Sequence, residues 1–270
     1  MFGWWRRWRR TRILQDPFPD DWEAILERSF PHQDRLSANE QTRLRERIQI
    51  FVAEKHWEGC RGLTMTDEIR VLVAAHACLL TLGLSDDVLN RVLSILVYPT
   101  AYVAKEIRQT GPGVIVHGRQ LRSGEAWYRG PVILSWEDIE AGTHRRTRGR
   151  NLVMHEFAHQ LDMLNGGTVD GTPPLADAAL RERWDDVMER AYRQLQEDCH
   201  RYGRNVLDCY GTTNRAEFFA VATEAFFESP RRLLRQDGAL YGVLSAYYLQ
   251  DPAGLPEGTA VISHPAAQVP

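Results

Sequence analysis

The chain is poor in cysteine and has no apolar run long enough to cross a bilayer. Its cysteines, Cys60, Cys78, Cys199 and Cys209, show no Cys-x-x-Cys spacing of the kind that binds zinc or exchanges disulfides. We expect them to be free thiols, packed as small hydrophobic side chains in a reducing compartment. The longest apolar stretch, residues 71–84, falls short of the roughly 20 residues that a transmembrane helix needs. These absences predict a cytoplasmic protein without a transmembrane segment.

Neither sign of charge dominates the composition. The chain has 33 basic and 36 acidic residues, for a net charge of −3, and 43% of its residues are hydrophobic. Such a globular composition gives no basic surface for direct binding to nucleic acid. The exception is a basic and aromatic extension, residues 1–14, which lacks the apolar centre of a secretory signal. We interpret it as a flexible terminus, with weak contact to a membrane surface or to an acidic partner as the alternative.

Helical periodicity fills the first part of the chain. Ser37 and Glu40 have the spacing of a capping box at the start of a helix predicted over residues 37–57. Apolar stripes predict further helices over residues 65–84 and 86–97. We therefore expect a cluster of helices before residue 111, where the composition becomes typical of strands.

Short runs of β-branched and aromatic residues follow glycine and proline at residues 111–113. The runs at residues 114–117 and 128–136 predict an antiparallel pair of strands. Two interpretations of this pair stand open: an edge strand that aligns an extended substrate by main-chain hydrogen bonds, or a plain structural hairpin.

The predicted fold is α+β, mainly helical, with this small antiparallel sheet beside the helix described next. We expect one folded domain over residues 15–250, with a helical part at 15–110 and a catalytic part at 111–250. The first 14 residues form an extension. A tail rich in proline and alanine, residues 251–270, completes the chain, and no internal repeat is visible.

Two histidines and a glutamate lie close together in one apolar segment. His155 and His159 are four residues apart, so on a helix both imidazoles can reach one metal ion. Glu156 would then lie beside the metal, where it can take a proton from water. By contrast, we interpret His56 and His76 as lone helical histidines with local hydrogen bonds and not as ligands.

A catalytic zinc site needs a third protein ligand besides the two histidines. Glu217 and Glu224 lie seven residues apart in an otherwise apolar helix, and therefore on one face of it. Their separation of about 10.5 Å along the axis makes binding of one ion by both improbable, so one would be the ligand and the other would orient a histidine. Asp162 and Asp170 are the remaining competitors, and Asp162 alternatively caps a loop or accepts a hydrogen bond from an imidazole.

Two helical motifs carry a resemblance to a known family: residues 155–162, HEFAHQLD, and residues 217–224, EFFAVATE. They closely resemble the Mlc titration factor A family of zinc peptidases. That family in turn resembles the catalytic domain of anthrax lethal factor around the same two helices. The resemblance covers roughly residues 15–255 and implies a zincin-like fold.

The resemblance implies a role for five residues of this chain. One Zn²⁺ ion would be held by His155, His159 and Glu217, with Glu156 as the general base. Tyr210 would donate a hydrogen bond to the oxyanion, which a neutral phenol can do. The alternative for Tyr210 is a core aromatic residue with a satisfied hydroxyl group.

Two functions from different classes follow. The first is a zinc-dependent peptidase, aminopeptidase-like on short peptides, that hydrolyses peptide bonds with metal-activated water. The second is a regulatory protein that binds a sugar-responsive transcriptional repressor and so relieves the repression of sugar uptake. The resemblance also implies autoinhibition, with a loop or the C-terminal tail over the site.

Overall fold

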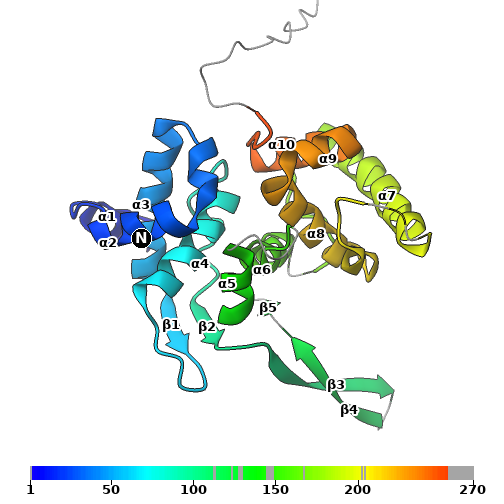
Figure 1. The fold of residues 1–270 in the computed structure, drawn as a ribbon, viewed down its shortest axis with the longest axis horizontal. Coiled ribbons are helices and arrows are strands. Elements are labelled where there is room, and N and C mark those ends of the chain that lie inside the picture. The colour runs from blue at the N-terminus through cyan, green and yellow to red at the C-terminus, as the bar shows by residue number, and fades with distance from the viewer. Residues whose placement is uncertain are drawn as a thin grey trace, which may run out of the picture.

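The structure is a computed structural model that describes residues 2–254, apart from 112–113, 123, 127–129, 144–148, 167, 202 and 204. Helices make up most of it, and a small sheet lies among them (Figure 1). Over these residues, no helix combines the length and the apolar character that crossing a membrane requires. The tail predicted at residues 251–270 lies outside the described residues from 255 onward.

Four α-helices and a 3-10 helix form the N-terminal half. These are α1 (Phe2–Ile13), α2 (Asp20–Ser29), η1 (Pro31–Arg35), α3 (Ala38–Glu54) and α4 (Asp67–Leu80).

The capping box predicted at the start of α3 is confirmed. The side chain of Ser37 accepts a hydrogen bond from the backbone of Glu40, and the Glu40 carboxylate accepts one from the backbone of Ser37. Together they satisfy two backbone donors that the helix end would otherwise leave unpaired. The helix predicted over residues 86–97 is wrong, because turns precede a strand that begins at Ser94.

The N-terminal extension is a helix and not the flexible terminus that its composition predicts. Arg10 on α1 forms two hydrogen bonds with the Glu54 carboxylate at the end of α3, at 2.8 and 2.9 Å. This bidentate ion pair fixes α1 against the helical half. Trp4, Trp5 and Trp8 remain exposed to solvent.

The sheet beside the central helices is mainly parallel, so the antiparallel sheet expected from the sequence is wrong. Its strands are β1 (His56–Gly59), β2 (Ser94–Tyr98), β6 (Val132–Ser135) and β5 (Gly124–Ala126), in that order across the sheet. The first three are parallel, and only β5, at one edge, pairs in the antiparallel sense. The chain reaches β2 from β1 through α4, as a parallel pair requires a crossover.

The predicted pairing of residues 114–117 with 128–136 is also wrong. Strand β4 (Val114–Arg122) pairs with β3 (Tyr102–Gly111) in a separate antiparallel hairpin, which projects away from the rest of the molecule (Figure 1). Strand composition predicts that a segment is extended, but it does not identify its partner. The start of the second predicted strand, residues 128–129, lies outside the described residues.

The C-terminal half is helical and lies beside the N-terminal helices, with α6 packed against α4 (Figure 1). Its elements are α5 (Trp136–Thr143), α6 (Leu152–Asp162), α7 (Ala178–His200), η2 (Cys209–Thr212), α8 (Arg215–Glu228), α9 (Pro230–Gln236) and α10 (Gly238–Tyr248). Helix α8 is buried along almost its whole length and packs against α6.

A disulfide joins Cys199 to Cys209, so the expectation that every cysteine is a free thiol is wrong. The two residues are 10 positions apart, and the chain reverses direction between the end of α7 and η2, which brings their Cα atoms within 5.8 Å. Cys60 and Cys78 are free. A search for Cys-x-x-Cys spacing does not detect a pair formed by a chain reversal.

Candidate metal centre

Helix α6 carries His155, which is half-buried, and Glu156 and His159, which are buried. It begins after Asn151, whose side-chain oxygen accepts a hydrogen bond from the backbone of Met154 at 3.0 Å. The two histidines are one turn apart, and their ring centroids lie 4.9 Å from each other. The cap and the apolar stripe thus fix a helix that turns both imidazoles to the same side.

Helix α8 brings Glu217 to these two imidazoles. Asn214 caps α8 by accepting a hydrogen bond from the backbone of Glu217 at 2.9 Å. The carboxylate oxygen Oε2 of Glu217 lies 2.9 Å from Nε2 of His155 and 3.5 Å from Nε2 of His159. One ligand atom from each of the three residues lies within 4.8 Å of the others.

Glu224 contacts the opposite side of the His155 ring. Its Oε1 atom lies 2.7 Å from Nδ1 of His155, and its Oε2 atom accepts a hydrogen bond from the backbone N–H of Asn151 at 2.5 Å. Nδ1 donates to this carboxylate, and Nε2 of His155 faces Glu217, where it would bind a cation in place of its proton. The two acids of α8 therefore meet different nitrogens of one ring.

Burial and charge pairing shift the pKa values of this cluster strongly. Burial opposes the charging of His155, but its hydrogen bonds to Glu217 and Glu224 outweigh burial and raise its pKa well above the usual value. Burial also opposes ionisation of Glu217, yet hydrogen bonds to His155 and His159 hold its pKa far below the usual range. Without a cation, the cluster thus holds a proton on His155 beside an ionised carboxylate.

Glu156 differs from the other acids because its environment favours the neutral form. Its side chain is buried, and burial raises the pKa of its carboxyl group to about 7, although His155 and His159 act in the opposite direction. A carboxyl group with a pKa near neutral can both accept and return a proton at physiological pH.

Tyr210 lies on η2, with its ring near that of His155. Its ring centroid is 6.0 Å from that of His155, and 51% of the residue is exposed. The disulfide of the preceding residue, Cys209, ties this turn to the end of α7. An exposed phenol beside the imidazoles does not have the burial expected of a core aromatic residue.

The aspartates considered as third ligands lie outside the cluster. Asp162 is fully buried and accepts a hydrogen bond from the backbone of Gly171 at 2.8 Å, so the prediction that it caps a loop is confirmed. Asp170 is exposed and accepts a hydrogen bond from the backbone of Thr172 at 3.0 Å. Gly171 holds this loop against the start of α8, where a Cβ atom would lie 2.4 Å from the carbonyl oxygen of Arg215.

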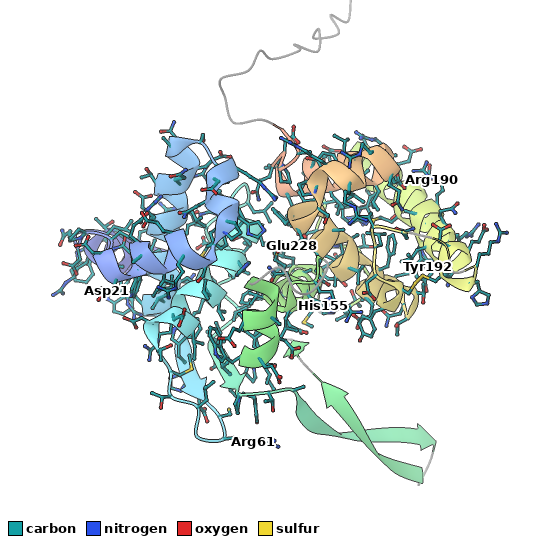
Figure 2. The ribbon with its side chains drawn as sticks, in the orientation of Figure 1. Asp21, Arg61, His155, Arg190, Tyr192 and Glu228 are labelled. Carbon is teal, nitrogen blue, oxygen red and sulfur yellow. A yellow bond between two sulfur atoms is a disulfide. The ribbon has the colours of Figure 1, made fainter. Side chains whose placement is uncertain are left out.

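The sequence did not reveal two features near the cluster. The first is the role of Asn151, which also donates a hydrogen bond from Nδ2 to the Glu228 carboxylate at 2.7 Å. The sequence pattern that could have indicated this role is an asparagine directly before an apolar helix. However, the acids that Asn151 contacts, Glu224 and Glu228, are remote from it in sequence. The second is the edge strand at α6, which is β5 and not the predicted strand at residues 128–136. Figure 2 shows His155 and Glu228 near the middle of the molecule, between its two helical halves.

Comparisons with known proteins agree on one family. The family model described as glucose-regulated metallo-peptidase M90 matches residues 5–249. An uncharacterized protein of Synechocystis is 39% identical over 249 residues, which cover 92% of this chain and 90% of that protein. Mlc titration factor A of Serratia proteamaculans is 32% identical and covers 86% of this chain and 87% of its own length. The protein of that name from Salmonella arizonae is 31% identical, with 91% and 96% covered.

Proposed function

This chain belongs to the glucose-regulated metallo-peptidase M90 family, and on that premise we propose that it is a zinc-dependent peptidase. Its catalytic domain would span residues 15–250, with one zinc ion held by His155, His159 and Glu217. The observation that carries the proposal is the approach of two imidazole nitrogens and one carboxylate oxygen to within 4.8 Å of one another. Two histidines and a glutamate are a ligand set of hydrolytic zinc sites that leaves one position open.

The chemistry of the donors fits a divalent ion of borderline softness. The carboxylate of Glu224 at Nδ1 of His155 leaves Nε2 available as a ligand, and Glu217 is ionised. When bound, such an ion supplies a Lewis acid that lowers the pKa of water and polarises a carbonyl group. Mn²⁺ or Co²⁺ would also suit this donor set in vitro.

Three residues around the metal ligands would carry out proton transfer, oxyanion stabilisation and positioning of the His155 ring. Glu156 takes the proton of the attacking water and returns it to the leaving amine, a role supported by its pKa near 7. Tyr210 donates a hydrogen bond from its hydroxyl group to the oxyanion, a role supported by the 6.0 Å separation of its ring centroid from that of His155. Glu224 is a positioning residue that holds the His155 ring.

We assign short peptides as the substrates and an aminopeptidase-like mode of cleavage. The antiparallel edge strand β5, next to α6, would pair with the main chain of an extended substrate. Peptides with a free amino terminus should then be cleaved faster than the same peptides with an acetylated one. Equal cleavage of both would reject the aminopeptidase assignment and leave an endopeptidase.

The experiment that tests catalysis compares wild type with Glu156→Gln on a peptide library after reconstitution with zinc. The amide keeps the shape of the side chain but cannot take the proton, so we expect turnover to fall by about 10²- to 10⁴-fold. Glu182→Gln, on the exposed face of α7, is the matched control and should leave turnover unchanged. Equal turnover by wild type and Glu156→Gln would refute the mechanism.

A second candidate function is the binding of a transcriptional repressor in the cytoplasm. It is supported by the relatives that carry the name Mlc titration factor A. Co-purification with a repressor of that kind, with and without a chelator, separates the two functions. Binding that survives metal removal is a surface property, whereas peptide cleavage should disappear.

A further inference from the structure

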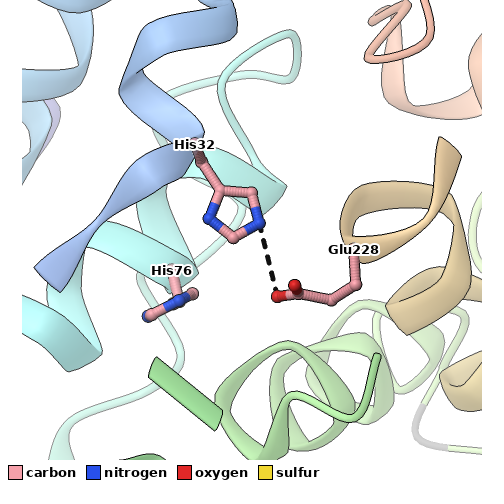
Figure 3. Close-up of side chains that lie close together, drawn as sticks. All are labelled: His32, His76 and Glu228. Carbon is pink, nitrogen blue, oxygen red and sulfur yellow. Dashed lines mark ion pairs between the residues drawn. The ribbon is translucent and has the colours of Figure 1, made fainter. Parts of the chain in front are cut away.

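A second cluster of potential metal ligands lies away from the candidate metal centre. His32 on η1, His76 on α4 and Glu228 at the end of α8 point toward one another (Figure 3). One ligand atom of each lies within 4.8 Å of the others, and within the described part of the chain only this group and the group at Glu217 have that property. Three segments remote in sequence therefore converge on one point.

The distances within this cluster suit a tetrahedral ion. Nε2 of His32 lies 3.3 Å from Oε1 of Glu228. Two ligands at about 2.0–2.1 Å from a tetrahedral zinc ion are themselves about 3.3 Å apart. Nδ1 of His76 lies 2.8 Å from the backbone oxygen of Leu72, one turn earlier in α4. With Nδ1 as the donor in that bond, Nε2 of His76 keeps its lone pair for a ligand bond.

His32 has fewer polar partners than a buried imidazole needs. It is buried and pairs with Glu228 through Nε2 at 3.3 Å, and among the described residues its Nδ1 atom has no hydrogen-bond partner. A buried polar atom without a partner is costly, and native structures contain few of them. A cation between the Nε2 atom of His32 and the Glu228 carboxylate would satisfy both groups.

We propose that His32, His76 and Glu228 form a second binding site for a divalent cation of the Zn²⁺ type, separate from the site at His155, His159 and Glu217. Two imidazoles and one carboxylate suit zinc better than the hard ions Mg²⁺ and Ca²⁺, which prefer oxygen ligands.

A cavity lies beside one of the three proposed ligands. This cavity of about 400 Å³ borders His32, and Arg35, Phe227 and Asp251 are among its other lining residues. Its lining comes from both the N-terminal and the C-terminal parts of the chain and includes His32 of the three proposed ligands, so an ion would approach the cluster from the side of His32. Bound there, the ion links η1 and α4 to the end of α8.

The second site is connected to the first through one residue. Asn151 donates a hydrogen bond from Nδ2 to Oε1 of Glu228, and its backbone N–H donates to Glu224. Glu224 in turn contacts Nδ1 of His155. An ion at Glu228 therefore fixes the position of Asn151, which caps α6 and contacts the acid that orients His155. The ion's role would be structural, and it would position the first site without touching a substrate.

The test measures zinc bound to the full chain after chelation, zinc addition and gel filtration. The double variant His155→Ala/His159→Ala removes the first site, and we expect it to retain about one zinc ion per chain, against about two for wild type. Adding His32→Gln to that variant should abolish the remaining binding. Adding His56→Gln to the double variant is the matched control, because His56 is an exposed histidine on β1. This change should leave the remaining zinc binding unchanged.

Cobalt provides a second readout that does not depend on activity. Co²⁺ added to the double variant should give the absorption of a tetrahedral site, and His76→Gln should remove it, with circular dichroism confirming that each variant is folded. A folded double variant that binds no metal, or whose metal survives His32→Gln, would overturn the proposal. Either result leaves the peptidase proposal intact. The variants tested lack His155 and His159, so their metal binding reports only on the site at His32, His76 and Glu228.

Discussion

The Glu224 carboxylate lies 2.7 Å from Nδ1 of His155, while Glu217 approaches Nε2 of the same ring at 2.9 Å. Both acids come from one face of α8, seven residues apart, and the imidazole lies between them. The pair resembles the carboxylate–histidine arrangement that orients metal ligands, in which the outer acid fixes the ring and raises its basicity. Glu224 and Glu217 are therefore expected to respond differently to substitution.

Glu224→Gln should weaken zinc binding by about 10- to 100-fold, because the amide orients His155 less firmly than the carboxylate does. Glu217→Gln should cause a larger loss, since it replaces the proposed third ligand itself. Competition with a chromogenic chelator measures both affinities. Two results would reverse the two assignments. One is a Glu217→Gln variant that binds zinc as tightly as wild type. The other is a Glu224→Gln variant that binds zinc more weakly than the Glu217→Gln variant does.

Tyr210→Phe should lower kcat by about 10²- to 10³-fold while leaving the zinc content unchanged, because only the hydroxyl group that stabilises the oxyanion is lost. Steady-state kinetics with metal analysis measures this. Tyr192→Phe is the control, since its hydroxyl group donates to the carbonyl oxygen of Thr212 on the same turn at 3.0 Å. The control should cost about 1 kcal/mol of stability and much less activity. Equal losses of kcat would make Tyr210 a structural residue.

The helices around the site were predictable because their signals are local. Apolar residues at helical spacing define α6 and α8, and a polar residue before each, Asn151 and Asn214, supplies the cap. The spacing of His155 and His159 also predicted that both rings would face one side. Periodicity alone does not decide which acid would approach them, since it places Glu217 and Glu224 on the same face; the choice of Glu217 came from the family resemblance.

The remaining features depend on tertiary contacts that no local pattern encodes. Strand β6 has the composition of either a parallel or an antiparallel strand, and its neighbour β2 was predicted as part of a helix. His76 carries the local hydrogen bond that was predicted for it, to Leu72. However, its approach to His32 and Glu228 depends on the packing of three distant segments. The Cys199–Cys209 disulfide likewise depends on a chain reversal that cysteine spacing alone does not reveal.

Reduction of the Cys199–Cys209 disulfide should destabilise the protein by about 3 kcal/mol. The bond joins residues 10 positions apart, and closing a loop of that size lowers the entropy of the unfolded chain. It should also lower kcat, since the bond holds the turn that carries Tyr210. Urea unfolding and kinetics with and without dithiothreitol measure the two effects. The double variant Cys199→Ser/Cys209→Ser should be insensitive to dithiothreitol. Identical stability of oxidised and reduced wild type would contradict the expectation.

Gly171→Ala should destabilise the protein by about 2–4 kcal/mol and weaken zinc binding. Its φ of +83° disfavours a side chain, and a Cβ atom would clash with the carbonyl oxygen of Arg215, two residues before Glu217. Gly166→Ala is a matched control: φ is +82°, but nothing lies within 4 Å of the added atom. It should cost about 1 kcal/mol and leave zinc binding unchanged. Equal effects of the two changes on zinc affinity would show that the clash does not reach Glu217.

The metal-free protein should lose stability as the pH falls from about 6.5 toward 4, through His76. Burial, reinforced by His32, lowers the pKa of His76 to about 4, although Glu228 acts in the opposite direction. In this window the unfolded chain takes up a proton that the folded one does not, so the free energy of unfolding falls by about 2–3 kcal/mol. His76→Gln should flatten this slope in urea unfolding, and His56→Gln should not. Parallel slopes for wild type and His76→Gln would mean that His76 is protonated in the folded state and paired with Glu228.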